Sequence, residues 1–188
     1  MPHKQPPSCF ICNRPANLTY RATDGPVTLA LQRNSRLGHE IGRDHRTVTA
    51  KATSDTSERS TLATQFDALL TQINDLTNDA SFAGTNLLQA APDNLTVTFN
   101  EDATSTLTIS GIDSTTGTGG LNVAGAVSNF GADTDIDAAI TAVNSAISTL
   151  RSTTSTLGSN ATVLQTRLNF TEDLVNTLIG GAGKLTLA

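Results

Sequence analysis

Aromatic and charged residues are both scarce in this chain of 188 residues. Only 4% of the residues are aromatic, none is Trp, and 15% are charged. A large aromatic core is therefore excluded, and any core depends on how the aliphatic residues are patterned. His, Cys and carboxylate side chains do not cluster as catalytic sites require, so the composition also argues against an enzyme.

Two further absences concern membranes and export. The chain contains no run of about 18 apolar residues, so we expect no membrane-spanning segment and no membrane partner. Residues 1–15 contain several prolines but lack the apolar stretch of about 7–15 residues that a cleavable secretory signal needs. If the chain is exported, we expect a route without a cleaved signal peptide.

The composition changes abruptly near residue 46. Residues 1–46 hold both cysteines, all three histidines and five of the six prolines, and they carry a net charge of +4 against -9 for the rest. Proline and glycine interrupt any helical periodicity in this stretch. We therefore predict an irregular basic tail over residues 1–46, and the break in composition suggests that the tail has a different origin from the rest.

Residues 47–90 predict a helical unit. The pattern begins near Val48 and continues into a heptad seam, which indicates an amphipathic helix with a partner helix. We expect this helix to end in a turn before Gly84, and to pair antiparallel with part of a longer helix further along the chain. The seam consists of Leu62, Phe66, Leu69, Ile73 and Leu76.

Residues 91–132 predict a small β-rich insert. Apolar residues alternate with Thr at Leu95 and Val97, and again at Leu107 and Ile109, as in half-buried strands. A hairpin with a polar connection at residues 100–104 is expected, and a weaker strand near residues 123–127. Gly, Thr and Ser dominate the rest of the insert, which we expect to be exposed.

Residues 133–188 give the clearest pattern in the sequence. Apolar residues recur at spacings of four and three from Ile136 to Leu178, and only Thr154 and Thr171 interrupt them. Such a helix is roughly 65 Å long, more than a compact domain can cover, so part of the seam needs a partner from another subunit or a missing segment. Its predicted end is the glycine cluster Gly180, Gly181 and Gly183.

These patterns together predict a mainly α fold with a small β excursion. We expect long heptad-patterned helices packed antiparallel, a β-hairpin insert and an irregular N-terminal tail.

Two segments of the helical parts carry short motifs. In residues 62–73 with 79–88, a helix is followed by Phe82 and Gly84 and then by Asn86-Leu87-Leu88. In residues 139–187, motifs at 148–152, 157–160 and 164–167 occur along a long helix. Both segments resemble the flagellin family.

The two segments occur in the family's order around a variable β-rich excursion. The resemblance implies a structural subunit of the bacterial flagellar filament, which contributes to motility through helix packing between identical subunits. It also implies an extracellular location, export through the flagellum, and contact with the export apparatus or a chaperone. The family's outermost helices have no counterpart here, so we expect a truncated flagellin with residues 1–46 foreign to the family.

A hook–filament junction protein is an alternative, because it shares the helical ends and differs in the middle. The motif at residues 164–167 favours flagellin itself.

A second alternative is a metal-binding regulatory protein. Cys9 and Cys12 form a CxxC pair, and His39 and His45 could complete a Cys2His2 zinc site. The long separation between Cys12 and His39 does not match known zinc modules, and a thioredoxin-like role lacks the surrounding βαβ unit. We therefore predict no metal and no cofactor.

Two charged clusters have simple interpretations. The arginines at 33, 36, 43 and 46 are interpreted as a solvated tail, since no reading module accompanies them and no nucleic-acid partner is expected. Asp133, Asp135 and Asp137 alternate like calcium ligands, but an EF-hand needs Gly and Glu where Ala138 and Asn144 stand. Helix capping is the better interpretation of these acids.

Overall fold

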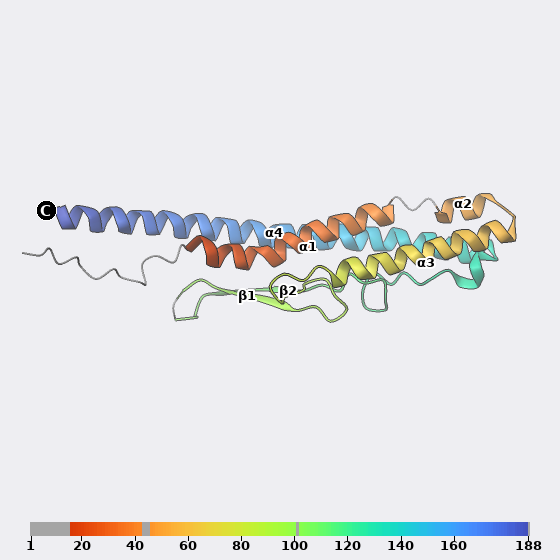
Figure 1. Cartoon of the computed structure of the whole chain (residues 1–188), viewed down its shortest axis with the longest axis horizontal. Helices are drawn as coiled ribbons and strands as arrows, with labels where there is room; N and C mark the ends of the chain where they lie inside the picture. The colour runs from red at the N-terminus through yellow and green to blue at the C-terminus, as the bar shows by residue number, and fades with distance from the viewer. Residues whose placement is uncertain (1–15, 43–45, 101, 188) are drawn as a thin grey trace, which may run out of the picture.

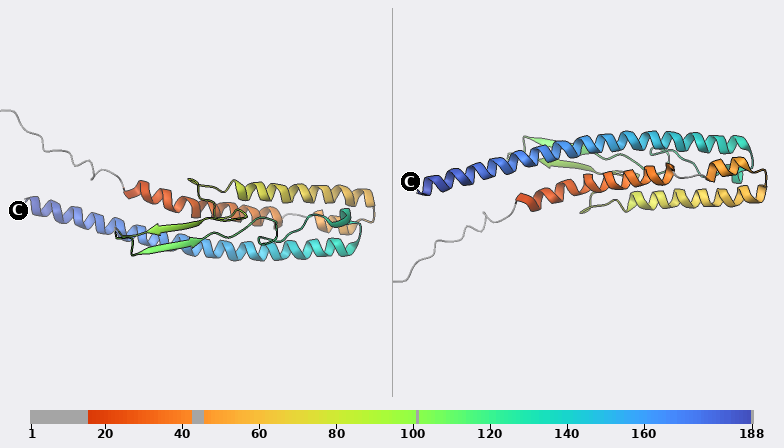
Figure 2. Two further views of the ribbon diagram at one scale, coloured as in Figure 1. Left: turned by 90° about the horizontal axis from the view of Figure 1, so that it is seen from below. Right: turned by 90° about the horizontal axis from the view of Figure 1, so that it is seen from above.

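The computed structural model describes residues 16–42, 46–100 and 102–187, which form an elongated helical rod with a small sheet along one side (Figures 1 and 2). The predicted mainly α fold with a β-hairpin is confirmed. Among the described helices, none is long and apolar enough to cross a bilayer. The elements in chain order are α1 (Ala16–Gly42), α2 (Arg46–Ala52), α3 (Thr56–Asn78), β1 (Asn94–Thr98), β2 (Thr106–Ser110), the short turn η1 (Val127–Phe130) and α4 (Asp133–Leu187).

α4 runs along the whole rod, and the other helices pack beside it (Figures 1 and 2). α1 is antiparallel to α4, whereas α3 runs in the same direction as α4. The expectation that the helix within residues 48–78 is the antiparallel partner is therefore wrong. The reason is that α1 occupies the antiparallel position, and the chain reverses after α2, so that α3 returns alongside α4.

The prediction of an irregular tail is wrong for residues 16–42, which form α1. Val27, Ala30, Leu37 and Ile41 recur at helical spacing and are buried. Pro26 lies inside this helix, where the missing N–H and the ring cost stability. Burial of the apolar face against α4 and α3 offsets that cost. Residues 1–15 lie outside the described part, and the division of the chain into four parts stays a prediction.

The predicted seam of α3 and the turn after it are confirmed. α3 begins at an N-cap, Asp55, whose Oδ1 accepts hydrogen bonds from the backbone N–H groups of Ser57 and Glu58 at 2.8 and 3.2 Å. Phe66, Leu69 and Ile73 are buried, and Leu62 and Leu76 are partly buried against the same core. After Asn78 the chain turns through Ala83 and Gly84, both with positive φ, where glycine is favoured.

The core consists of two clusters that follow one another along the rod. The first lies where α2, α3 and the first half of α4 meet, and it contains a tilted contact between the rings of Phe66 and Phe130, with centroids 5.5 Å apart. The second lies between the hairpin, the middle of α1 and the centre of α4. Its buried members are Val27, Ala30, Ala80, Leu87, Leu88, Val97, Ile109, Leu157 and Leu164.

The predicted hairpin is confirmed. β1 and β2 pair antiparallel, with Val97 opposite Leu107 and Leu95 opposite Ile109. Val97 and Ile109 are buried in the second cluster, as the alternation predicts. The weaker strand expected near residues 123–127 is not formed. There the backbone is held by local bonds, such as Val123 N–H to the carbonyl of Thr116 at 3.0 Å, and it leads into η1.

α4 is longer than expected at its C-terminal end. The glycine cluster at residues 180–183 was predicted to end the helix, but α4 continues to Leu187. The prediction was wrong because glycine costs only about 1 kcal/mol in a helix interior and keeps its N–H donor, so it weakens a helix without terminating it.

Candidate assembly surface

Burial of the α4 seam changes along the helix. Each second member of the seam is fully buried as far as Leu164, and those between are partly buried as far as Leu168. From residue 169 to residue 186 every side chain is exposed. Within the described chain, part of the seam therefore has no partner, as its length predicted. The buried members are Ile136, Val143, Leu150, Leu157 and Leu164.

In this exposed part, the seam members Val175 and Leu178 and the flanking residues Phe170, Leu174 and Ile179 form an apolar face, here called the α4 stripe. At about 100° per residue, these positions fall within one half of the helix circumference, so they share one side of the helix. Phe170, Leu178 and Ile179 are 66, 64 and 66% exposed. Single exposed apolar residues are ordinary, but a contiguous group of this kind marks an interaction site.

Acidic side chains border the α4 stripe on both sides. At about 100° per residue, Glu172 lies next to Ile179 on one edge, and Asp173 lies nearer to Phe170 on the other. Both acids are exposed. The C-terminal third of α4 is therefore an amphipathic helix with an apolar centre and negatively charged edges.

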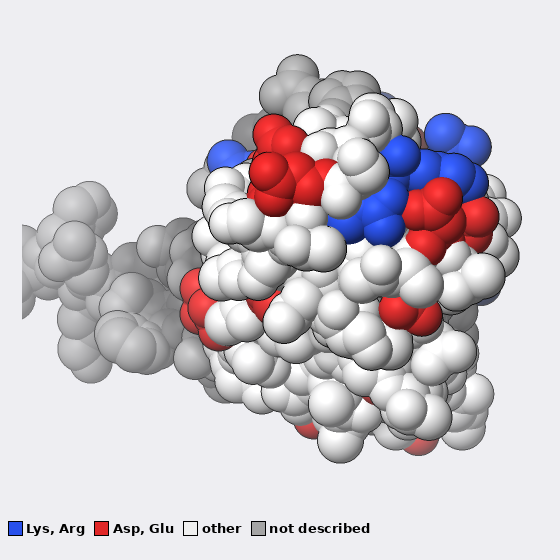
Figure 3. Space-filling model, turned by 90° about the vertical axis from the view of Figure 1, so that its right-hand side faces the viewer, with Lys and Arg blue, Asp and Glu red and all other residues white. Residues whose placement is uncertain are grey.

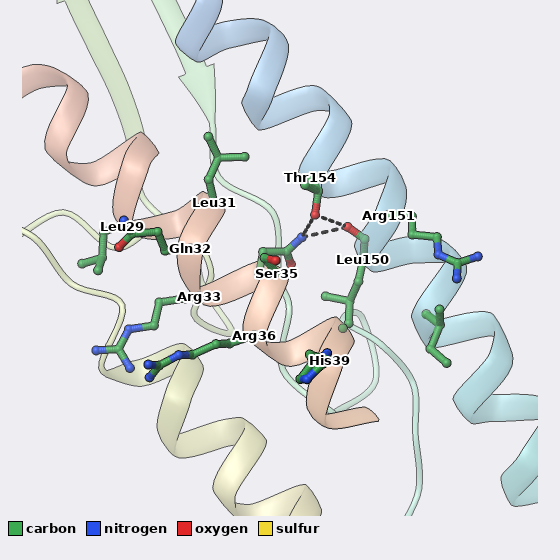
Figure 4. Close-up of a pocket in the computed structure, with 13 residues that line it drawn as sticks. Leu29, Leu31, Gln32, Arg33, Ser35, Arg36, His39, Leu150, Arg151 and Thr154 are labelled. Carbon is green, nitrogen blue, oxygen red and sulfur yellow. Dashed lines mark hydrogen bonds between the residues drawn. The ribbon is translucent and has the colours of Figure 1, made fainter. Parts of the chain in front are cut away.

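A groove of about 1290 Å³ lies between α1 and the middle of α4 (Figure 4). Its apolar lining includes Leu31, Ile147 and Leu150, and Leu150 is buried. No acidic side chain lines it among the described residues. Its charged lining consists of Arg33 and Arg36 from α1 and Arg151 from α4, and His39 of α1 also lines it.

Asn34 fixes α1 against α4 at this groove. Its side-chain Nδ2 donates to the backbone carbonyl of Leu150 at 2.8 Å and to Oγ1 of Thr154 at 2.7 Å, shown dashed in Figure 4. Thr154 therefore interrupts the apolar seam because it faces a buried amide. The Oδ1 atom of Asn34 accepts no hydrogen bond from any described residue.

The end of the rod opposite the α4 stripe carries both acidic and basic side chains (Figure 3). Asp133 and Asp135 lie in the first turn of α4, as predicted for acids near the positive end of a helix dipole. Ion pairs that the sequence did not predict also reach this end. Arg59 of α3 pairs with Asp133 at 2.6 Å, and Lys51 of α2 pairs with Asp137.

Comparison with known proteins bears on the fold. No family model matches the sequence, and no curated protein matches it. Among solved structures, the crystal structure of Bacillus cereus flagellin superposes with a TM-score of 0.64 over 80% of this chain and 88% of that chain, at 19% sequence identity. This chain has a flagellin-like fold. The similarity extends over most of both chains.

Within this flagellin-like fold, the turn after α3 is organised by Asn86, whose role sequence reasoning missed. Its buried side chain makes four hydrogen bonds. Nδ2 donates to the carbonyls of Thr77 and Asn78 at 2.9 and 3.0 Å, and Oδ1 accepts from the N–H groups of Leu88 and Gln89 at 2.9 and 3.2 Å. The amide thus caps the C-terminal end of α3 and aligns the Asn86-Leu87-Leu88 motif.

Phe82 of the same flagellin-like motif lies against α1. A Cβ atom at Gly25 would lie 2.6 Å from the Cζ atom of the Phe82 ring, so a larger residue there would require the ring to move. The turn after α3 therefore also fixes the middle of α1. From sequence alone, the Gly25-Pro26 pair predicts a break in a helix, so it does not reveal this contact.

Of the four residues considered for a zinc site, only His39 lies within the described part of the chain. Cys9, Cys12 and His45 lie outside the described residues, and His39 lies exposed on α1. Within residues 16–42, 46–100 and 102–187, no three His, Cys, Asp or Glu side chains are placed to share a metal.

Some of the arginines that were assigned to an irregular, solvated tail lie on helices. Arg33 and Arg36 lie on α1 beside the groove, so their assignment to an irregular tail is wrong. Arg43 lies outside the described part, and Arg46 begins α2.

Proposed function

We propose that this chain is a structural subunit of the flagellin type, which assembles with other copies of itself through the α4 stripe. The observation that carries the proposal is an exposed apolar face on a flagellin-like fold. In a monomer, Phe170, Leu178 and their neighbours remain in water, and covering them with a second copy is favourable. The elongated rod suits packing side by side or end to end.

We extend the proposal to the location, the export route and the transient partners of the subunit. The flagellin-like fold and the resemblance of the two helical segments support this extension. We place the subunit in an extracellular flagellar filament, where it contributes to motility through helix packing. Export would use the flagellar route without a cleaved signal, with the export apparatus or a chaperone as transient partner. The work of such a subunit is mechanical, and the proposal assigns it no catalysis.

Self-association of the full chain tests this proposal. We expect sedimentation velocity to show assemblies that grow with protein concentration, and negative-stain electron microscopy to show elongated particles. Replacing Leu174 and Leu178 with Asn should shift the protein to the monomer, since both side chains are exposed and their loss spares the core. A matched control replaces Val48 and Val127, which are also exposed but lie away from α4's free end.

The control variant should assemble like the original chain. A monomer at every concentration, or equal assembly of both variants, would contradict the proposal.

A further inference from the structure

The α4 stripe and the α1–α4 groove have complementary chemistry. The stripe is an apolar helix face bordered by Glu172 and Asp173, both exposed. The groove combines apolar lining with Arg33, Arg36 and Arg151, and no acid lines it. In Figure 4, Arg33 and Arg36 extend from α1 on one side and Arg151 extends from α4 on the other. A helix with acids on both edges thus matches a groove with arginines on both sides.

A chain cannot place its own stripe in its own groove. Both features belong to one uninterrupted helix, since Ile147, Leu150 and Arg151 of the groove and Leu178 of the stripe all lie on α4. Arg151 and Leu178 are roughly 40 Å apart along a straight helix at 1.5 Å per residue. A stripe that docks in the groove must therefore belong to another copy.

We propose that the α4 stripe of one copy docks in the α1–α4 groove of the next copy. The inference rests on the proposed function, and it specifies the contact by which the subunits assemble. A head-to-tail contact of this kind uses two different surfaces, so a chain of docked copies always keeps one free stripe at one end and one free groove at the other. Such a contact builds a fibre when the rotation between successive copies does not close into a ring.

A pair of charge-reversed full-length variants tests this contact. The groove variant carries Arg36→Glu and Arg151→Glu, and the tail variant carries Glu172→Arg and Asp173→Arg. All four side chains are exposed, so the fold should be kept, which circular dichroism checks. Each variant alone brings like charges together at the contact and should associate roughly tenfold more weakly or worse. Mixing the two variants restores opposite charges at both contacts and should restore assembly to the original level.

A matched control and the behaviour of the unmodified chain separate the possible failures. Asp75→Arg with Asp102→Arg makes the same change in net charge on exposed residues of α3 and the hairpin loop, and this control should assemble like the unmodified chain. If the groove variant alone assembles like the unmodified chain, the stripes pair with one another or elsewhere, and the inference is wrong while the proposed function stands. If the unmodified chain never assembles, the proposed function itself fails.

Discussion

At the scale of single residues, Arg59 joins three parts of the rod. It is only 8% exposed, and its Nε donates to the carbonyl of Thr53 at 2.8 Å. Its other nitrogens reach the carbonyls of Phe130 and Gly131 at 3.4 Å and the carboxylate of Asp133 at 2.6 Å. These bonds hold the entry to α4, where Ser128, Asn129 and Phe130 all have positive φ. Such conformations persist only where the surroundings enforce them.

Arg59→Ala should therefore destabilise the chain by roughly 2 kcal/mol, through lost bonds to backbone carbonyls and lost packing of the side-chain stem. Asp133→Asn should cost less than about 1 kcal/mol, because the Asp133 side chain is 62% exposed and its ion pair is screened by water. Urea unfolding followed by circular dichroism measures both. Equal losses would show that the ion pair, rather than the carbonyl contacts, gives Arg59 its importance.

Asn86 offers a second test at this scale, because its amide acts as donor and acceptor at once. Asn86→Asp keeps the size and the acceptor but loses the donors to Thr77 and Asn78. It also places a negative charge at the C-terminal end of α3, where the helix dipole disfavours it. We expect a loss of roughly 2–3 kcal/mol, at least as large as that of Asn86→Ala, in thermal or urea unfolding at neutral pH. A smaller loss for Asp than for Ala would contradict the capping role.

At the scale of elements, the sequence predicted those whose periodicity is local and missed those that depend on tertiary packing. The seams of α3 and α4 and the hairpin follow from spacing alone, as Phe66, Leu150 and Val97 show. α1 was missed because Gly25 and Pro26 weigh against a helix locally, while the burial that offsets them comes from α4 and from Phe82. The groove was missed for the same reason, because it exists only once α1 lies beside α4.

Replacing glycine with alanine should have opposite effects on stability at two positions. Helix propensity decides the outcome at one, and packing decides it at the other. A Cβ at Gly158, inside α4, meets no atom within 4 Å, so Gly158→Ala should stabilise the chain by roughly 0.5–1 kcal/mol. A Cβ at Gly111 would collide with the backbone oxygen of Asp93 and lie 2.5 Å from Cβ of Pro92, so Gly111→Ala should destabilise. Thermal unfolding of the two variants gives the sign. A loss of stability at Gly158 would indicate a close neighbour on this face of α4.

At the scale of the whole molecule, the rod has a packed part and a free part. Two core clusters hold α1, α3, the hairpin and α4 as far as Leu164, whereas residues 169–186 contribute no buried side chain. A helix without tertiary contacts is marginal at a length of this order, and three glycines within residues 180–183 weaken it further. The surface proposed for assembly is therefore also the least stable part of α4, and assembly should order it.

Hydrogen exchange measured by mass spectrometry should resolve this coupling. In dilute monomer, amides of residues 169–187 should exchange fast and those of residues 136–164 slowly, because local opening costs little where nothing is buried. In assembled protein, exchange of residues 169–187 should slow by roughly tenfold or more, while residues 56–62, which belong to neither stripe nor groove, stay unchanged. The variant with Asn at positions 174 and 178 should not show the slowing. Strong protection of residues 169–187 in the monomer would mean that the chain covers its own stripe, and that no second copy is needed to order α4.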